Sequence, residues 1–302
     1  MYLQGITMLN RDLFKLTLKT TWTTLLLILL ASSLRSQMPQ NPSPMVEHTR
    51  PHPRLRKETP PGRREKLELG TLFIPAKLKN HTRARLLFFF HGGDWLPAVA
   101  AARRRGVAVV TIQSGSGSST YERLFENSKR FPDLIAEAES RSNMKFSEIE
   151  LGGWSAGCGA IRKILRDPPS YNRVSRVLCI DGVHTSYVNG HPGPKESNIE
   201  TAPLQIWLKF GRAAMAGEKH LIITHSEIFP GTFASTTETA DYLLREWGLK
   251  PHPVLKWGPM KTQVLSEVKR GNLLVMGFAG NSAPDHVDEL ESLPEYLKWL
   301  MK

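Results

Sequence analysis

A serine flanked by glycines is the first feature of this sequence that indicates chemistry. Gly153-Trp154-Ser155-Ala156-Gly157 has the G-x-S-x-G pattern. An apolar run at 149–154 precedes it and a helix-like stretch at 156–166 follows it. At such a junction, glycines let the backbone turn sharply and hold the serine exposed at the start of the helix. We therefore predict that Ser155 is the nucleophile of an acyl-transfer reaction.

A serine nucleophile needs a general base, and His286 is placed to supply one. It ends the loop segment 280–286, which follows the last apolar run at 272–278 and precedes a helical pattern at the C-terminus. The chain has ten histidines, so the prediction rests on this position. A histidine there accepts the serine proton and later returns a proton to the leaving group.

An acidic residue must orient the histidine, and the sequence offers two candidates. Asp181 ends the apolar run 174–181, and Glu227 follows the run 220–225. Either carboxylate can hold the imidazole and stabilise its cation. Asp285 adjoins His286 and is expected to point elsewhere.

A glycine-rich turn supplies candidate donors for a developing oxyanion. His91-Gly92-Gly93 directly follows the apolar run 85–90. Backbone N–H groups of Gly92 and Gly93, together with that of Ala156, are placed to bind the oxyanion, and each such donor contributes about 2.7–4 kcal/mol.

Four residues near the expected strand ends could be taken for metal ligands, namely Asp181, His184, His225 and Glu227. Their spacing fits no familiar metal motif. We interpret them as the polar rim of a pocket and predict no metal and no cofactor.

These residues need a scaffold, and residues 65–302 alternate strand-like apolar runs with helix-like stretches. Such alternation with short connections predicts an α/β domain with a mostly parallel central sheet and helices on both faces. The expected strands are 66–75, 85–90, 106–112, 149–154, 174–181, 220–225 and 272–278. The expected helices are 95–105, 121–140, 156–166, 203–216, 236–247 and 288–301.

The residues His91-Gly92-Gly93, Gly153–Gly157 and Pro284-Asp285-His286, in this order and on these elements, resemble the α/β-hydrolase superfamily. The likeness covers about residues 66–302, and the turns at 181–184 and 225–227 are similar to those of secreted bacterial serine esterases. The resemblance implies a sheet of about eight strands and serine-hydrolase chemistry. Many members of the superfamily place an aspartate a few residues after the penultimate strand. In this chain the residues that follow the 220–225 strand include no aspartate at that place.

We therefore expect a serine hydrolase that cleaves a carboxylic ester, either a small molecule or one linked to a polymer. An amidase or peptidase on the same fold is the first alternative. The second is a non-catalytic binding module that retained the fold.

The N-terminal residues have the features of an export signal. Arg11, Lys15 and Lys19 precede an apolar run at 22–31, which is followed by small residues. The run is too short to span a bilayer. We predict a signal peptide at 1–36, a disordered Pro/Arg-rich linker at 37–64, and a secreted or periplasmic protein. Contact with a membrane is expected only through the N-terminal segment, if it stays uncleaved.

The net charge of +12 does not by itself indicate a nucleic-acid partner, because residues 1–66 carry +7 of it. We predict no nucleic acid among the partners.

The two cysteines, Cys158 and Cys179, have no metal-binding spacing. Export permits a disulfide, but their apolar surroundings favour buried free thiols.

Overall fold

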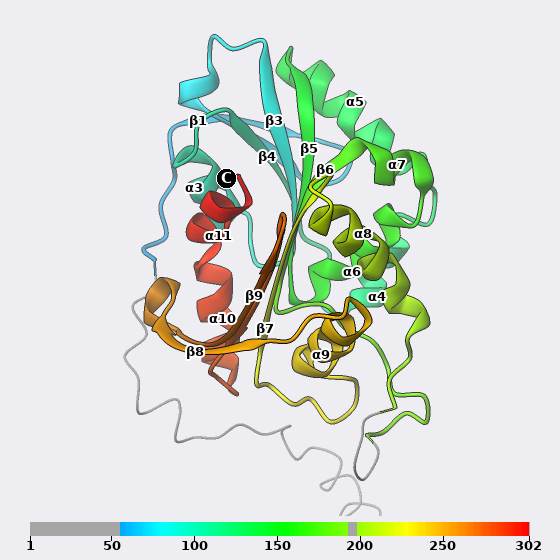
Figure 1. The fold of residues 1–302 in the computed structure, drawn as a ribbon. Helices are drawn as coiled ribbons and strands as arrows, with labels where there is room; N and C mark the ends of the chain where they lie inside the picture. Colours follow the sequence, from blue (N-terminus) through cyan, green and yellow to red (C-terminus); the bar gives the residue numbers. More distant parts are fainter. Residues whose placement is uncertain (1–54, 193–197, 302) are drawn as a thin grey trace, which may run out of the picture. The chain divides into compact units, whose positions relative to one another are not determined.

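Six parallel strands form the centre of the sheet and place the candidate residues (Figure 1). The computed structural model describes residues 55–192 and 198–301. The predicted signal peptide and most of the predicted linker lie outside these residues. In spatial order the parallel strands are β4 (Val107–Ile112), β3 (Arg83–Phe90), β5 (Lys145–Trp154), β6 (Val174–Ile180), β7 (His220–Ser226) and β10 (Leu273–Phe278).

Antiparallel strands extend this centre at both ends. On one side β2 (Thr71–Pro75) pairs with β4, and β1 (Gly62–Lys66) pairs with β2. On the other side β9 (Gln263–Arg270) pairs with β10, and β8 (His252–Trp257) pairs with β9. The described residues thus form a ten-stranded sheet, two strands more than the resemblance implies.

The predicted linker ends too late in the sequence. It was expected to run to residue 64, but β1 begins at Gly62. The side chains of β1 are mostly exposed, so the strand lacks the apolar alternation by which a sequence indicates a strand. Its backbone pairing with β2 and the Arg64 guanidinium over the Phe73 ring hold it in the sheet.

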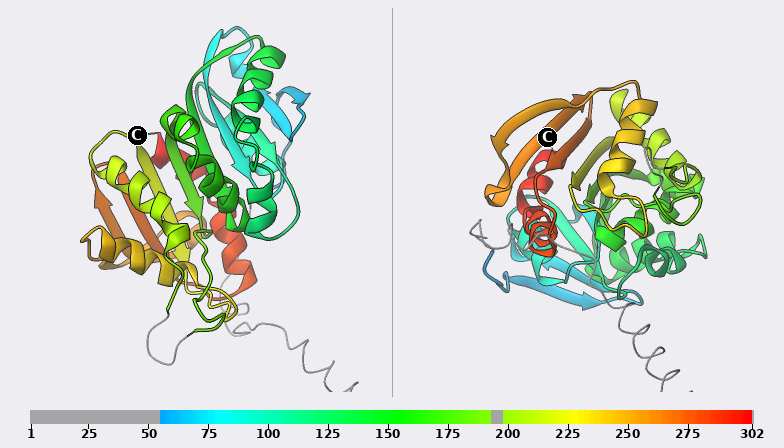
Figure 2. Two further views of the ribbon diagram at one scale, coloured as in Figure 1. Left: turned by 90° about the vertical axis from the view of Figure 1, so that its right-hand side faces the viewer. Right: turned by 90° about the horizontal axis from the view of Figure 1, so that it is seen from below.

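Helices cover both faces of the sheet, and in Figure 2 the C-terminal helices lie against one face. That face carries α3 (Trp95–Ala102), α10 (Ala283–Glu291) and α11 (Leu293–Leu300). The opposite face carries α4 (Ser118–Arg123), α5 (Arg130–Ser142), α6 (Cys158–Leu165), α7 (Pro168–Arg173), α8 (Gln205–Met215) and α9 (Thr236–Glu246). Short 3-10 turns are η1 (Ala76–Leu78), η2 (Ser155–Gly157), η3 (Ala202–Leu204) and η4 (Pro259–Lys261).

Strand β3 shows why the centre of the sheet is apolar throughout. Phe88 and Phe90 pack into the core under α4–α9, whereas Leu87 and Phe89 pack into the core under α3 and α11. Successive side chains of a strand point to opposite faces, so a strand covered on both faces must be continuously apolar.

The helix predictions were right in position and less accurate in extent. The helix predicted at 121–140 is two helices, α4 and α5, and the C-terminal helix predicted at 288–301 is also two, α10 and α11. Helix α10 begins at Ala283, five residues before the predicted start, because Ser282 caps it and Asp285 completes a capping box.

The α/β prediction with a mostly parallel sheet and helices on both faces is confirmed. A sharp strand-to-helix turn carries Ser155 after β5, and the other candidate residues follow neighbouring strands at the same edge of the sheet. These are the features of the α/β-hydrolase fold.

The two cysteines are joined, contrary to the prediction of free thiols. Cys158 in the first turn of α6 and Cys179 on β6 form a disulfide with a Cα–Cα separation of 5.9 Å. Both residues lie in the core as expected, but the β5–α6–β6 connection brings the start of the helix over the neighbouring strand. The bond ties the helix that follows Ser155 to the strand that ends before Asp181.

No helix among residues 55–192 and 198–301 is long and apolar enough to cross a membrane.

Candidate active site

The turn that carries Ser155 is held in a backbone conformation that side chains rarely adopt. Trp154 ends β5 in an extended conformation, and Ser155 then has a φ of 49°. A Cβ on Gly157 would lie 2.1 Å from the Phe90 carbonyl oxygen, so only glycine lets the turn approach the end of β3. Positive φ at a non-glycine residue occurs where surrounding packing imposes it, often at functional sites.

His286 is positioned by the first turn of α10. The side chain of Ser282 caps this helix, and the Asp285 carboxylate accepts hydrogen bonds from the backbone N–H groups of Asn281 and Ser282. Asp285 therefore faces the cap, as expected, while His286 points toward Asp181. The imidazole Nδ1 lies 2.7 Å from Asp181 Oδ2.

Asp181 is a buried carboxylate surrounded by donors. Ser226 donates its backbone N–H to Oδ1 at 3.0 Å and its hydroxyl to Oδ2 at 2.7 Å. The Thr236 hydroxyl donates to Oδ1 at 2.5 Å. With His286 the carboxylate accepts four hydrogen bonds, which fix its plane and direction.

The electrostatic environment keeps Asp181 ionised. Burial alone raises the pKa of this carboxyl, but the hydrogen bond and charge of His286, with the hydroxyls of Thr236 and Ser226, hold the pKa well below its ordinary value. An ionised carboxylate is acceptor-only, so the proton of the shared hydrogen bond lies on Nδ1 of His286. The other ring nitrogen, Nε2, is then free to accept a proton.

Glu227, the second candidate acid, lies elsewhere. Its side chain is exposed, and its backbone N–H donates to the Gly280 carbonyl. The neighbouring residue Ser226 is the one whose side chain faces Asp181. The structure therefore brings Asp181, and not Glu227, to His286.

The four residues considered as metal ligands do not converge. Asp181 is occupied by the donors described above, and His225 Nδ1 lies 2.9 Å from the Thr237 hydroxyl. Burial lowers the pKa of both His184 and His225 to about 4. Within the described ranges, no group of three or more His, Cys, Asp or Glu side chains is arranged to hold a metal ion.

The predicted oxyanion turn lies against the nucleophile turn. Gly92 and Gly93 have φ values of 93° and 85°, in the region that favours glycine. A Cβ on Gly92 would lie 3.3 Å from the ring of Trp154, the residue that precedes Ser155. Ala156 is in the first turn of η2, where backbone N–H groups have no partner within the helix.

Trp154 packs between two histidines of the site. Its ring stacks on His91 with centroids 4.9 Å apart and an interplanar angle of 13°. The other contact is with the His286 ring, at 4.5 Å between centroids. The indole Nε1 also donates to the His286 carbonyl at 3.0 Å, so Trp154 holds both the ring and the backbone of His286.

A second buried carboxyl lies behind Asp181. Thr224 Oγ1 accepts from the Asp181 backbone N–H at 3.1 Å and lies 2.5 Å from Glu289 Oε2. Burial raises the pKa of Glu289 well above its ordinary value, and the Asp181 charge raises it further. Burial and the nearby Asp181 charge thus both disfavour the ionised form of Glu289, whereas the donors around Asp181 favour its ionised form.

A cavity of about 110 Å³ opens beside the candidate nucleophile. Ser155, Asp181 and His286 all line it. The rest of its wall comes from Thr236 and from the loops after β6 and β7. These three candidate residues therefore share one space in which a substrate can contact them.

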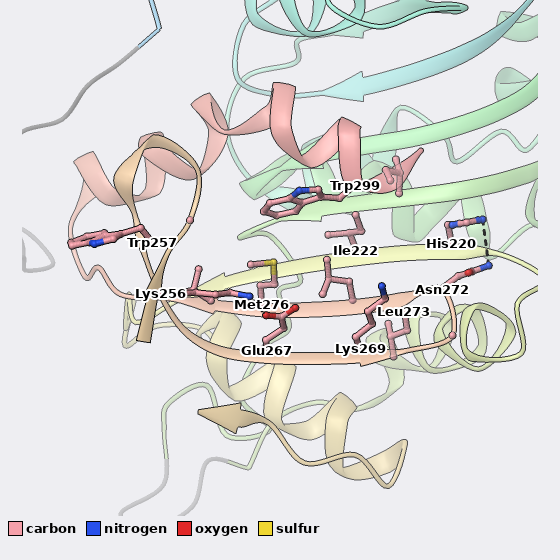
Figure 3. Close-up of a pocket in the computed structure, with 15 residues that line it drawn as sticks. His220, Ile222, Lys256, Trp257, Glu267, Lys269, Asn272, Leu273, Met276 and Trp299 are labelled. Carbon is pink, nitrogen blue, oxygen red and sulfur yellow. Dashed lines mark hydrogen bonds and ion pairs between the residues drawn. The ribbon is translucent and has the colours of Figure 1, made fainter. Parts of the chain in front are cut away.

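A larger groove of about 530 Å³ lies away from this cluster, between α11 and strands β7–β10 (Figure 3). Trp299 lies over a floor that includes Ile222 and Met276, and Lys256 and Glu267 border it. It shares no lining residue with the cavity beside Ser155.

Three contributors to the site were not predicted from the sequence. Ser226 and Thr236 donate to Asp181, and Trp154 holds His286. Ser and Thr are common on loops and at helix starts, so their types gave no signal. Trp154 stands at a variable position of the G-x-S-x-G motif, so its type gave no signal either.

Comparison with known proteins gives similarity of backbone arrangement only. No protein-family model and no curated protein matches this sequence. An acetyl xylan esterase from Aspergillus awamori is 14% identical over 76% of this chain and 93% of its own, with a TM-score of 0.45. The carboxylesterase CesB (YbfK) from Bacillus subtilis is 9% identical over 81% of this chain and 92% of its own, with a TM-score of 0.42.

A puromycin-hydrolyzing peptidase from Mycobacterium tuberculosis is 13% identical over 77% of this chain and 38% of its own, with a TM-score of 0.40. At such identities the reaction and substrate of those proteins do not transfer to this chain. The fold assignment rests on the strand order and connections of the structure itself.

Proposed function

We propose that this chain is a serine hydrolase that cleaves carboxylic esters by acyl transfer, with Ser155, His286 and Asp181 as its catalytic residues. The observation that carries the proposal is the hydrogen bond of 2.7 Å between His286 Nδ1 and buried Asp181, beside a cavity that Ser155 also lines. A base oriented by an acid next to a partly exposed serine is an arrangement suited to nucleophilic catalysis.

In the first half-reaction, Ser155 Oγ attacks the carbonyl carbon of the ester while its proton passes to Nε2 of His286. Asp181 stabilises the resulting imidazolium and keeps its orientation. The tetrahedral intermediate collapses when the C–O bond to the alcohol breaks, and the alcohol oxygen takes the proton from Nε2. The acyl group remains as an ester on Ser155.

In the second half-reaction, water attacks the acyl carbon and gives a proton to Nε2. The bond from the acyl carbon to Oγ then breaks, Oγ regains the proton, and the carboxylic acid is released. In both halves the negative oxygen of the intermediate accepts hydrogen bonds from the N–H groups of Gly92, Gly93 and Ala156. Every group that reacts in these two half-reactions belongs to the protein chain, to the ester or to water.

Asp181 is the proposed acid in preference to Glu227. Its carboxylate is buried, ionised and in contact with the imidazole, whereas Glu227 is exposed. A buried charge that accepts several hydrogen bonds keeps its direction, so it holds the base in one tautomer.

The proposal is tested by labelling the purified chain with a fluorophosphonate probe, which reacts with activated serines. We expect labelling of the wild type and loss of labelling in Ser155→Ala and His286→Ala. Ser186→Ala and His252→Ala are matched controls, because both residues are exposed and neither lines the cavity. A folded wild type that stays unlabelled refutes the mechanism and favours a binding module.

The same preparations distinguish ester from amide cleavage. We expect turnover of p-nitrophenyl acetate and little turnover of p-nitroacetanilide, which carries the same acyl group on an amide. The reverse order of rates would favour an amidase or peptidase on this fold.

We further propose that the chain is exported and acts outside the cytoplasm. The Cys158–Cys179 disulfide supports this, because disulfides persist mainly in oxidising compartments. We expect residues 1–36 fused to a reporter to direct secretion, and the mature chain to begin after the apolar run at 22–31. A reporter that stays inside the cell contradicts export.

A further inference from the structure

The cavity beside Ser155 has a wall that consists mainly of apolar side chains from one loop. Ile228, Pro230 and Phe233 follow β7, and His184 follows β6. The His184 and Phe233 rings meet edge to face with centroids 5.2 Å apart. The two loops thus close one side of the space that faces the nucleophile.

Hydrogen bonds hold the loop after β6 to the loop after β7 and to α9. The Ala234 N–H donates to the Thr185 carbonyl at 3.0 Å. On the next turn, the Thr239 hydroxyl donates to the Val183 carbonyl at 2.7 Å. Ala234 and Thr239 are fully buried, so the backbone that follows Phe233 and the backbone beside His184 are held in place, while the Phe233 ring is 37% exposed at the rim of the cavity.

The cavity offers no positive charge to an acyl group. Burial lowers the pKa of His184 to about 4, so this ring is neutral at neutral pH. The oxygens of Asp181 are already occupied by Ser226, Thr236 and His286. A charged acyl chain, such as that of a dicarboxylic acid, would find no partner on this wall.

The volume limits what can enter. About 110 Å³ is smaller than an engineered apolar cavity of about 150 Å³ that holds one benzene ring. A carbonyl group with one or two further carbons fills this space. A long alkyl chain exceeds it.

We propose that this cavity is the acyl pocket and that it restricts the enzyme to esters of short, uncharged acids such as acetate and propionate, with Phe233 setting the limit. The proposal rests on the serine-hydrolase function proposed above. The alcohol leaves after the first half-reaction and water replaces it, so the alcohol side must stay open to solvent. The acyl group stays bound until the second half-reaction and therefore occupies the restricted side.

The test compares p-nitrophenyl acetate, butyrate and octanoate, which share one leaving group. For the wild type we expect kcat/KM to fall by about tenfold or more from acetate to octanoate, since even one methylene changes selectivity in a tight pocket by about tenfold. We expect Phe233→Ala to raise the octanoate-to-acetate ratio of kcat/KM by about tenfold. Phe229→Ala is the matched control, because Phe229 lies on the same loop, is 57% exposed and does not line the cavity.

Two outcomes overturn the pocket proposal without touching the hydrolase proposal. One is a wild type that is labelled at Ser155 but cleaves octanoate as fast as acetate. The other is a Phe233→Ala octanoate-to-acetate ratio of kcat/KM equal to that of wild type, or to that of Phe229→Ala.

A second series, of acetate esters with different alcohols, tests which side of the substrate the cavity binds. Selectivity that follows the alcohol alone would assign the cavity to the leaving group and would also overturn the pocket proposal. Absence of both labelling and ester turnover instead refutes the hydrolase function itself.

Discussion

Replacing Asp181 by asparagine keeps the size of the side chain but changes one oxygen into an NH₂ group. Both carboxylate oxygens accept hydrogen bonds, so the new donor must face one pair of partners. At the Oδ1 position it would meet the Ser226 backbone N–H, which cannot reverse its direction. At the Oδ2 position it would meet the Ser226 hydroxyl, which can rotate, and His286, which can change its tautomer.

The amide is therefore expected at the Oδ2 position, with its donor toward His286. The imidazole then accepts at Nδ1 and carries its proton on Nε2, where it cannot take the proton of Ser155. The variant also loses the attraction between carboxylate and imidazolium, which is about 4 kcal/mol for charges about 4 Å apart at an effective dielectric constant of about 20. We expect kcat to fall by about a thousandfold, with KM little changed.

The assay is hydrolysis of p-nitrophenyl acetate by Asp181→Asn and Glu227→Gln, with fluorophosphonate labelling and thermal unfolding of each variant measured alongside. Glu227→Gln should retain wild-type kcat, since Glu227 is exposed. A folded Asp181→Asn enzyme with wild-type kcat, or a large loss in Glu227→Gln alone, would refute the assignment of the acid.

Three further changes test other parts of the structure. Glu150 is fully buried and burial raises its pKa to about 7, so the native state keeps a proton that the unfolded chain releases above about pH 4.5. The unfolding free energy should thus fall by about 3 kcal/mol as pH rises from about 4.5 to 7, and urea unfolding of Glu150→Gln should lack this fall. Trp154→Phe keeps a ring against His286 but loses the Nε1 hydrogen bond, and kcat/KM should drop several-fold, consistent with about 1 kcal/mol. Gly157→Ala places a Cβ 2.1 Å from the Phe90 carbonyl oxygen and should lower stability by about 1–3 kcal/mol in thermal unfolding.

The central strands could be predicted because burial on both faces leaves a continuous apolar run. The hairpin of β8 and β9 could not, since β8 (His252–Trp257) is largely exposed and carries Leu255 and Trp257 at 80% and 73% exposure. An edge strand is held by backbone pairing to its neighbour, which imposes no apolar pattern on its side chains. For the same reason the start of β1, residues 62–64, was assigned to the linker.

Ser155, His286 and the glycine turn could be proposed as site residues from the sequence, because each follows an apolar run at a point where the chain must turn. The disulfide was not predicted, because pairing depends on how closely α6 approaches β6, and the sequence gives only that both cysteines are in apolar runs. Topology, and not composition, brings such residues together.

The choice between Asp181 and Glu227 as the proposed acid could not be made from the local sequence. Asp181 and Glu227 both follow strands, and the choice between them depends on the directions of their side chains. Asp181 has a φ of 40° and turns its carboxylate toward Ser226 and Thr236, residues 45 and 55 positions later in the chain. Once Ser226 faces Asp181, the alternation of an extended chain sends Glu227 to the other side, where it is exposed. The proposed acid, Asp181, is thus distinguished by a set of donors that only the folded chain assembles, and the position of one of them, Ser226, leaves Glu227 exposed.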